Sequence, residues 1–187
     1  MKRVNDIFYS LQGEGHNTGR AAVFVRFAGC NLRCAFCDTQ FDAFRLLTDQ
    51  QIVDAIAPYP TRLVVLTGGE PTLQADAAFI QLLHSHGYEV AMESNGTHLP
   101  PEGIDWLTCS PKGPVAISRC DELKCVFDGH PEHIDTYGIQ ARYQYLQPCD
   151  VGDAERNAAI TRACIAYIQQ HPEWRLSLQT HKLAGFK

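Results

Sequence analysis

Three cysteines in one short loop carry the clearest chemical signal in this chain. Cys30, Cys34 and Cys37 have the spacing C-x3-C-x2-C and directly follow an apolar run, residues 21–28, that is typical of a β-strand. Three thiolates so close together can bind three irons of a cubane cluster, whose complete protein ligand set is four cysteines. No fourth cysteine lies nearby, so one iron would be open to a small molecule, as in an open catalytic zinc site. The loop therefore predicts a catalytic [4Fe-4S] cluster.

Other uses of cysteine fit the sequence less well. Zinc fingers and ribbons use two separated Cys/His pairs, and the chain has neither a second C-x2-C nor an H-x3–5-H partner. A disulfide framework needs a small secreted chain with paired cysteines. The remaining cysteines match no cluster pattern, and we expect free thiols there, with a second site at Cys120-x4-Cys125 as the alternative. They are Cys109, Cys120, Cys125, Cys149 and Cys164.

Length and charge limit the remaining possibilities. The 187 residues are typical of one domain, covering 1–187. With 16 Lys and Arg against 21 Asp and Glu, the net charge of −5 argues against a general binder of nucleic acid or membrane surfaces. No apolar run approaches the ~18 residues of a membrane helix, and the N-terminus lacks the apolar core of a signal peptide. These features predict a soluble, cytoplasmic protein.

The cysteine loop should lie at the end of a sheet strand in an α/β fold. After 21–28, strands are expected at 62–67, 88–93, 104–108, 123–127 and 142–147, with a last one at 174–178. Helices are expected from the capping box at Thr48 to near Pro58, and over 74–86, 131–139 and 153–170. Residues 7–20 are expected to form an irregular loop. About six strands in βα order are too few for an eightfold barrel, which needs ~250 residues. We therefore predict an open partial α/β barrel that lacks helices on one side, and a homodimer that covers that side.

Several polar residues outside the cysteine loop are placed to bind a ligand. Gln12 and Glu14 alternate with glycines, which lets the backbone approach a ligand closely. Arg26 alternates with apolar residues in the first predicted strand, where an arginine buried without a partner would be costly, so it is expected to face a polar cavity. A strand ending at Thr67 leads into Gly68-Gly69-Glu70-Pro71, whose paired glycines offer backbone groups to a ligand.

The cysteine spacing, with Phe36 just before the third cysteine, resembles the radical S-adenosylmethionine (SAM) enzymes. In that superfamily the amino and carboxylate groups of SAM bind the open iron and the aromatic residue packs beside the adenine. The Gly68-Gly69-Glu70-Pro71 stretch resembles the segment that holds the SAM amino group.

Eight sequence blocks in a fixed order, the two above included, narrow the resemblance to the 7-carboxy-7-deazaguanine synthases and extend it over nearly the whole chain. The blocks are Phe8-x-Ser10-Leu11-Gln12-Gly13-Glu14-Gly15 with Thr18-Gly19, Phe24-x-Arg26, the Cys30–Asp38 loop with Thr39, Thr67-Gly68-Gly69-Glu70-Pro71, Glu93-Ser94-Asn95-Gly96-Thr97, Ser110-Pro111-Lys112, Leu146-Gln147-Pro148 and Gln179-Thr180-His181-Lys182. The stretch between Cys37 and Leu63 is shorter than in many relatives, which would leave the access side of the cluster more open.

The resemblance implies a radical ring contraction of 6-carboxy-5,6,7,8-tetrahydropterin to 7-carboxy-7-deazaguanine, with loss of ammonia, in the pathway to queuosine and other 7-deazapurines. It implies a [4Fe-4S] cluster, SAM and Mg²⁺ as cofactors, with Thr39 on Mg²⁺, and flavodoxin or ferredoxin as the reductant. The SAM-binding residues that it implies are Phe36, Cys37, Asp38, Gly68, Gly69, Glu70, Ser110, Pro111, Lys112 and Gln147. The implied pterin-binding residues are Leu11, Gln12, Gly13, Glu14, Arg26, Thr67, His181 and Lys187.

Two other functions remain open at this point. An activating enzyme for a glycyl-radical partner would also combine a C-x3-C-x2-C loop with a short barrel, but it would need a large protein-docking surface. A non-catalytic iron–sulfur electron carrier or a zinc module belongs to a different class and would neither bind nor cleave SAM.

Overall fold

A nine-stranded sheet in the order β3-β1-β2-β4-β5-β6-β7-β8-β9 organises the chain. The structure is a computed structural model that describes residues 1–37 and 43–187. The strands are β1 (Lys2–Leu11), β2 (Ala21–Phe27), β3 (Arg45–Leu47), β4 (Leu63–Gly68), β5 (Glu89–Ser94), β6 (Trp106–Cys109), β7 (Arg119–Phe127), β8 (Gln140–Pro148) and β9 (Trp174–Leu176). All seven strands from β2 onward in this order pair in parallel, whereas β1 pairs antiparallel with both β2 and β3.

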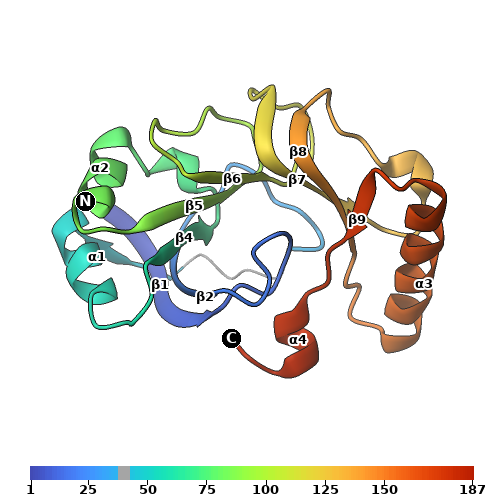
Figure 1. The fold of residues 1–187 in the computed structure, drawn as a ribbon, viewed down its shortest axis with the longest axis horizontal. Helices are drawn as coiled ribbons and strands as arrows, with labels where there is room; N and C mark the ends of the chain where they lie inside the picture. The colour runs from blue at the N-terminus through green and yellow to red at the C-terminus, as the bar shows by residue number, and fades with distance from the viewer. Residues whose placement is uncertain (38–42) are drawn as a thin grey trace.

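The sheet curves but does not close, because β3 and β9 stand at opposite edges of the order (Figure 1). This confirms the predicted open partial barrel. The six expected barrel strands correspond to β2 and β4 to β8, and the expected last strand is β9. Strands β1 and β3 were not predicted, and the expectation of an irregular loop over 7–20 is wrong as far as Leu11.

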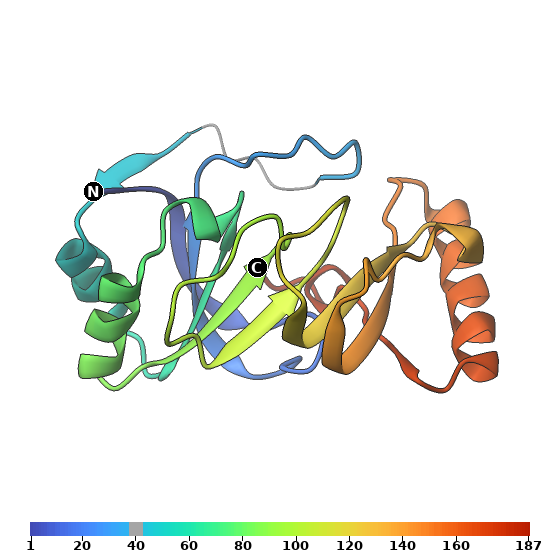
Figure 2. The same cartoon turned by 90° about the horizontal axis from the view of Figure 1, so that it is seen from above.

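Helices cover the outer face of the sheet at its two sides, as Figures 1 and 2 show. They are α1 (Asp49–Ile56), α2 (Ala77–Ser85) and α3 (Ala154–Gln170). The short α4 (Thr180–Ala184) instead lies on the inner, concave side of the sheet (Figure 1). Thr48 caps α1 through the predicted capping box, and Asp153 caps α3. The helix expected over 131–139 is wrong: the chain forms a single 3₁₀ turn, η2 (Pro131–His133), with no buried residue to hold a longer helix. A second 3₁₀ turn is η1 (Pro71–Leu73).

No helix among the described residues connects β5 to β6 or β6 to β7. The outer face of these strands is therefore covered by connecting segments, as expected for a barrel with missing helices. In the described part of the chain no helix is both long and apolar enough to cross a membrane.

The two faces of the sheet have different cores, because successive side chains of a strand point to opposite faces. In β2, Val23 and Val25 join the large outer core beneath the helices, whereas Phe24 joins a small inner cluster. The inner cluster fills only part of the space that the curved sheet encloses. The rest of that space is the candidate site.

Candidate active site

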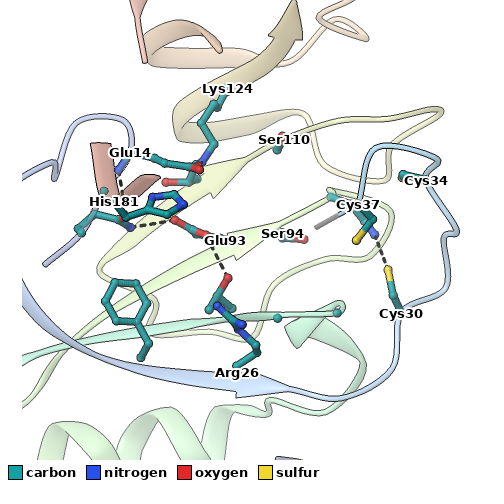
Figure 3. Close-up of a pocket in the computed structure, with 18 of the residues that line it drawn as sticks. Glu14, Arg26, Cys30, Cys34, Cys37, Glu93, Ser94, Ser110, Lys124 and His181 are labelled. Carbon is teal, nitrogen blue, oxygen red and sulfur yellow. Dashed lines mark hydrogen bonds and ion pairs between the residues drawn. The ribbon is translucent and has the colours of Figure 1, made fainter. Parts of the chain in front are cut away.

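A cavity of about 720 Å³ lies on the inner face of the sheet and extends to the cysteine loop. Figure 3 shows the three cysteines at one end, and Lys124, Glu14 and His181 gathered away from them. Most of the predicted site residues line this cavity: Leu11, Gln12, Gly13, Glu14, Arg26, Cys30, Cys34, Phe36, Cys37, Thr67, Gly68, Gly69, Ser110, Lys112, His181 and Lys187.

Some predicted residues lie elsewhere. Asp38 and Thr39 fall outside the described residues. Glu70 and Gln147 do not line this cavity, and Pro111 lines an adjoining one of about 220 Å³ that shares Phe36 and Lys112 with it.

The cysteine loop begins directly after β2 and passes over the ends of the central strands (Figure 2). Its cysteines form no disulfide with any other described residue, and the Cys37 backbone N–H donates to Cys34 O at 3.1 Å, which folds the second half of the loop into a turn. Cys30 Sγ accepts from Leu32 N at 3.4 Å and from Asn95 Nδ2 at 3.9 Å. Donors of this kind stabilise thiolates and tune the clusters that they bind.

The donor set fits a cubane cluster with an open iron. Three thiols line one end of the cavity, and no fourth cysteine is among the described lining residues. Cys30, Cys34 and Cys37 could therefore hold three irons, which leaves the fourth facing the cavity.

The glycine pair after β4 sets the position of this loop. Gly69 N donates to Phe27 O at 3.0 Å, and Glu70 N donates to Gly29 O at 2.9 Å. A Cβ on Gly69 would stand 1.9 Å from Gly29 O, so no other residue fits there without moving the loop. Both glycines also line the cavity, but the reason that the fold requires Gly69 is this backbone contact rather than a ligand.

Glu70 connects three loops from a fully buried position. Its side chain is 0% exposed, and its carboxylate accepts from Asn95 N at 2.8 Å, Ser94 Oγ at 2.9 Å and Thr72 Oγ1 at 2.6 Å. Asn95 in turn donates to Asn31 Oδ1 at 3.0 Å in the cysteine loop. The carboxylate thus binds other groups of the protein, and through Asn95 it helps to fix the position of the cysteine loop.

At the other end, polar side chains form a network around Glu93. Gln12 Nε2 donates to Glu93 Oε1 at 2.8 Å, and Thr67 Oγ1 donates to Glu93 Oε2 at 3.0 Å. Glu14 N donates to Gln12 Oε1 at 3.2 Å. The network fixes Glu93 as a hydrogen-bond acceptor facing the cavity.

Glu14 is a second acceptor, and a buried ion pair keeps it charged. Lys124 Nζ donates to Glu14 Oε2, and Gln179 Nε2 donates to Glu14 Oε1 at 3.1 Å. Burial alone would raise the pKa of Glu14, but the charge and hydrogen bond of Lys124 outweigh it, so the pKa falls from its usual 4.5 to about 2. Glu14 is therefore an ionised carboxylate at every physiological pH.

Arg26 lies on an aromatic surface between the two ends of the cavity. Its guanidinium stands over the Phe8 ring at 5.3 Å, and Phe8 stacks on Phe24 with ring centroids 4.9 Å apart. Arg26 lines the cavity, and no ion pair to it is found among the described residues, so its fork could meet a ligand carboxylate. Both rings line the cavity and give it an apolar wall beside Arg26.

The C-terminal segment closes the polar end. Thr180 N and Oγ1 donate to Gly13 O at 3.0 and 2.8 Å, which holds α4 against the Gln12-Gly13-Glu14-Gly15 stretch. A Cβ on Gly13 would lie 2.5 Å from His181 Nδ1, so the glycine makes room for that ring. Lys187 also lines the cavity, and its carbonyl oxygen accepts from Ser10 Oγ at 2.5 Å.

Three of the SAM-binding residues implied by the resemblance form hydrogen bonds within the protein. Lys112 Nζ donates to Ser110 O and Oγ at 2.8 and 2.9 Å, so these two line the cavity as one unit. Gln147 Oε1 accepts from Ser177 Oγ at 2.9 Å, and that hydroxyl accepts from Gly15 N at 2.9 Å. Gln147 therefore does not line the cavity but helps, through Ser177, to hold Gly15 at the polar end.

Lys124 and Glu93 are the site residues that sequence reasoning missed as ligand-binding groups. Lys124 stands in the predicted strand 123–127, whose other residues are apolar, and pairs with a residue 110 positions away. A lone lysine between Leu123 and Cys125, pointing to the face opposite theirs, is the signal that could have found it.

The other cysteines are held as thiols. Burial raises the pKa of Cys109, Cys120 and Cys125 to about 12 and that of Cys164 to about 11. Cys125 Sγ donates to Asp135 O at 3.6 Å. Thiols with such pKa values are unreactive at neutral pH, which supports free thiols over a second site at Cys120 and Cys125.

Comparison with known proteins gives one consistent family. Residues 24–110 match the Radical SAM superfamily. The chain is 51% identical over 190 residues to the 7-carboxy-7-deazaguanine synthase of Bacteroides thetaiotaomicron, with all of both chains covered, and 46% identical to that of Bordetella pertussis, with 97% of each covered. The crystal structure of QueE from Escherichia coli superposes with a TM-score of 0.75 at 27% identity, covering 95% of this chain and 93% of that one. The chain belongs to the 7-carboxy-7-deazaguanine synthase family of radical SAM enzymes.

Proposed function

We propose that the chain converts 6-carboxy-5,6,7,8-tetrahydropterin to 7-carboxy-7-deazaguanine, with loss of ammonia, inside the 720 Å³ cavity. The observation that carries this proposal is that one cavity joins a three-cysteine cluster site to a pair of fixed carboxylate acceptors. Because the chain belongs to the 7-carboxy-7-deazaguanine synthase family, we do not favour the two alternative functions, a glycyl-radical activating enzyme and a non-catalytic electron carrier.

The cluster end holds the radical-generating cofactors. When bound and reduced, the [4Fe-4S] cluster and SAM supply a 5′-deoxyadenosyl radical that exchanges a hydrogen atom with the substrate. Cys30, Cys34 and Cys37 would bind the cluster. The residues around it would hold SAM: Phe36, Asp38, Gly68, Gly69, Ser110, Pro111 and Lys112, with Glu70 and Gln147 acting through their neighbours.

The polar end recognises the pterin. A pterin has a guanine-like edge with adjacent N–H donors, and Glu14 and Glu93 are acceptors fixed by Lys124, Gln12 and Thr67. Backbone groups of Leu11 and Gly13 would add to this edge. A site built from buried polar groups rejects analogues that lack the matching groups, since its own groups would then be unpaired.

Charge would set the orientation of the substrate. Its carboxylate is repelled by Glu14 and Glu93, so it turns toward Arg26, with His181 and Lys187 nearby on the lining. The ring would then lie against the apolar wall that Phe8 and Phe24 form. Holding the ring at both ends places the reacting carbon in one geometry relative to the cluster end.

Mg²⁺ belongs to the cofactor set of this family, and we assign Thr39 as its protein oxygen. Mg²⁺ commonly combines few protein oxygens with waters and substrate. Replacing Thr39 with Ala should raise the Mg²⁺ concentration that gives half-maximal turnover, while leaving SAM binding intact.

Turnover of anaerobically reconstituted protein tests the proposal. With SAM, dithionite, Mg²⁺ and 6-carboxytetrahydropterin, mass spectrometry should detect 7-carboxy-7-deazaguanine and ammonia. Cys34→Ala should abolish both this product and 5′-deoxyadenosine, whereas Cys149→Ser, a cysteine outside the cavity, should retain them. SAM cleavage by the wild type without the deazaguanine would show that the substrate is wrong.

The partners follow from the same chemistry. The cluster needs a one-electron reductant, for which we propose flavodoxin or ferredoxin, and the reduced thiols fit a cytoplasmic location.

We also propose a homodimer, in which a second copy covers the outer face of β5 to β7, where connecting segments replace helices. Light scattering that gives a monomer at micromolar concentration would contradict the dimer.

A further inference from the structure

Lys124 is an unusual residue for the middle of an inner strand. It lies in β7 between Leu123 and Cys125, which both face the outer core, so its own side chain points into the barrel. The side chain is only 7% exposed, and its ammonium lines the cavity (Figure 3). Burying an ammonium is costly unless charged partners surround it.

The charges around Lys124 supply that environment. Burial alone lowers the pKa of Lys124, but the charges of Glu14 and Glu93 and the hydrogen bond with Glu14 outweigh it and raise the pKa above its usual value. The ammonium thus stays protonated and keeps Glu14 ionised.

The ammonium has unused hydrogen-bonding capacity on the cavity side. It carries three N–H donors, of which one bonds to Glu14. Among the described residues, Glu14 is the acceptor found for this ammonium. Glu14 and Lys124 therefore present a carboxylate acceptor directly beside an ammonium donor.

We propose that Lys124, together with Glu14, determines specificity for a 4-oxo pyrimidine ring. Glu14 accepts from the ring N3–H while Lys124 donates to the neighbouring carbonyl oxygen at C4, a contact that the proposed function does not by itself require. A 4-amino ring reverses both groups: its N3 lone pair meets the carboxylate, and its amino group meets the ammonium. The inference rests on the proposed function, because it assumes that a pterin occupies the cavity.

Two pteridines that differ only at this edge test the proposal. They are 6-carboxypterin and 2,4-diaminopteridine-6-carboxylate, both fluorescent, titrated into reconstituted protein with SAM at a pH of about 7, where carboxylic acids are ionised and the 4-oxo ring keeps its N3–H. The wild type should bind the 4-oxo compound about 100-fold or more tightly than the 4-amino compound. The ratio is measured within one sample of each variant, so it does not depend on how much of that variant is folded.

Three variants separate recognition from folding. Lys124→Gln should lower the selectivity ratio at least about tenfold. Glu14→Gln combined with Lys124→Met removes both charges, avoids an unpaired buried carboxylate, and should abolish the selectivity. Lys2→Met is the matched control: Lys2 is also 7% exposed and ion-paired, to Asp49, but lies in the outer core, so it should keep the wild-type ratio.

The outcomes are distinct. A wild-type ratio that persists in Lys124→Gln and in the double variant would overturn the role of Lys124 and leave the proposed function intact. Failure of the wild type to bind either pteridine, despite binding SAM, would overturn the proposed function and this inference together.

Discussion

The Glu70 carboxylate accepts a hydrogen bond from Asn95 N at 2.8 Å, and Asn95 Nδ2 donates to Asn31 in the cysteine loop. Through this contact the turn after β4 fixes the turn after β5, and both fix the loop after β2. The cluster end is therefore held by buried hydrogen bonds between three parallel strands rather than by the short loop alone.

Glu70→Ala should destabilise the protein by about 2–4 kcal/mol, because each buried donor left without its acceptor costs about 1–3 kcal/mol. Glu70→Gln keeps one acceptor oxygen and should recover part of this loss. Urea denaturation of the apo-protein measures both, with Glu102→Ala, at an exposed carboxylate, as the control. An Ala variant as stable as the wild type would show that the Glu70 contacts are not important for the fold.

Gly69→Ala should lower the iron bound per chain after reconstitution. The added methyl would meet Gly29 O at 1.9 Å and push the cysteine loop away from β4. Gly113→Ala is the control, since a Cβ there meets nothing within 4 Å. Iron analysis and cluster absorbance give the result, and full iron content in Gly69→Ala would argue against this contact as the positioning device.

Arg26→Gln should weaken binding of 6-carboxypterin about 10- to 100-fold, because hydrogen bonds to charged groups contribute about 1.5–3 kcal/mol. Binding of pterin without the 6-carboxylate should change little. Equal losses for both ligands would mean that Arg26 supports the fold or the Phe8 ring instead of the carboxylate.

Acid should destabilise the fold partly through Glu14. Its folded-state pKa of about 2 lies below the usual 4.5, so its stabilising effect is complete above about pH 4.5 and is lost as the pH falls toward 2. This loss amounts to roughly 3–3.5 kcal/mol at most. Glu14→Gln should show a correspondingly shallower decline in the free energy of unfolding over that window, and an unchanged decline would contradict the depressed pKa.

Local patterns were enough to predict the barrel strands, because β2 and β4 to β6 carry apolar runs. In β7 and β8 charged and polar residues interrupt the apolar ones, and only the stretches 123–127 and 142–147 of these strands were predicted. Strand β1 was missed since a bulge between Val4 and Asp6 shifts its register. Val4 joins the outer core while Phe8 joins the inner cluster, so the strand has no single alternation to detect. Helix α4 buries no residue and is held by a contact to Gly13 that local pattern cannot show.

The site was predictable where residues form motifs and not where they meet across the sheet. The cysteine loop and Gly68-Gly69 are contiguous and were found. The partners of Glu14 come from β7 and from the C-terminal segment, so the ion pair with Lys124 exists only after folding. For Glu70 the sequence motif was recognised, but the predicted role differs from the observed contacts. Its carboxylate accepts hydrogen bonds from residues of the protein's own loops.

The most direct test measures 5′-deoxyadenosine and 7-carboxy-7-deazaguanine together in single samples that contain SAM, reductant, Mg²⁺ and 6-carboxytetrahydropterin. The wild type should form the deazaguanine, and Cys34→Ala should form neither product. Arg26→Gln should still cleave SAM. At a substrate concentration that half-saturates the wild type, this variant should form much less deazaguanine than the wild type does. Wild-type yields of deazaguanine from Arg26→Gln, or none from the wild type with an intact cluster, would contradict a single cavity with a radical-forming end and a pterin-binding end.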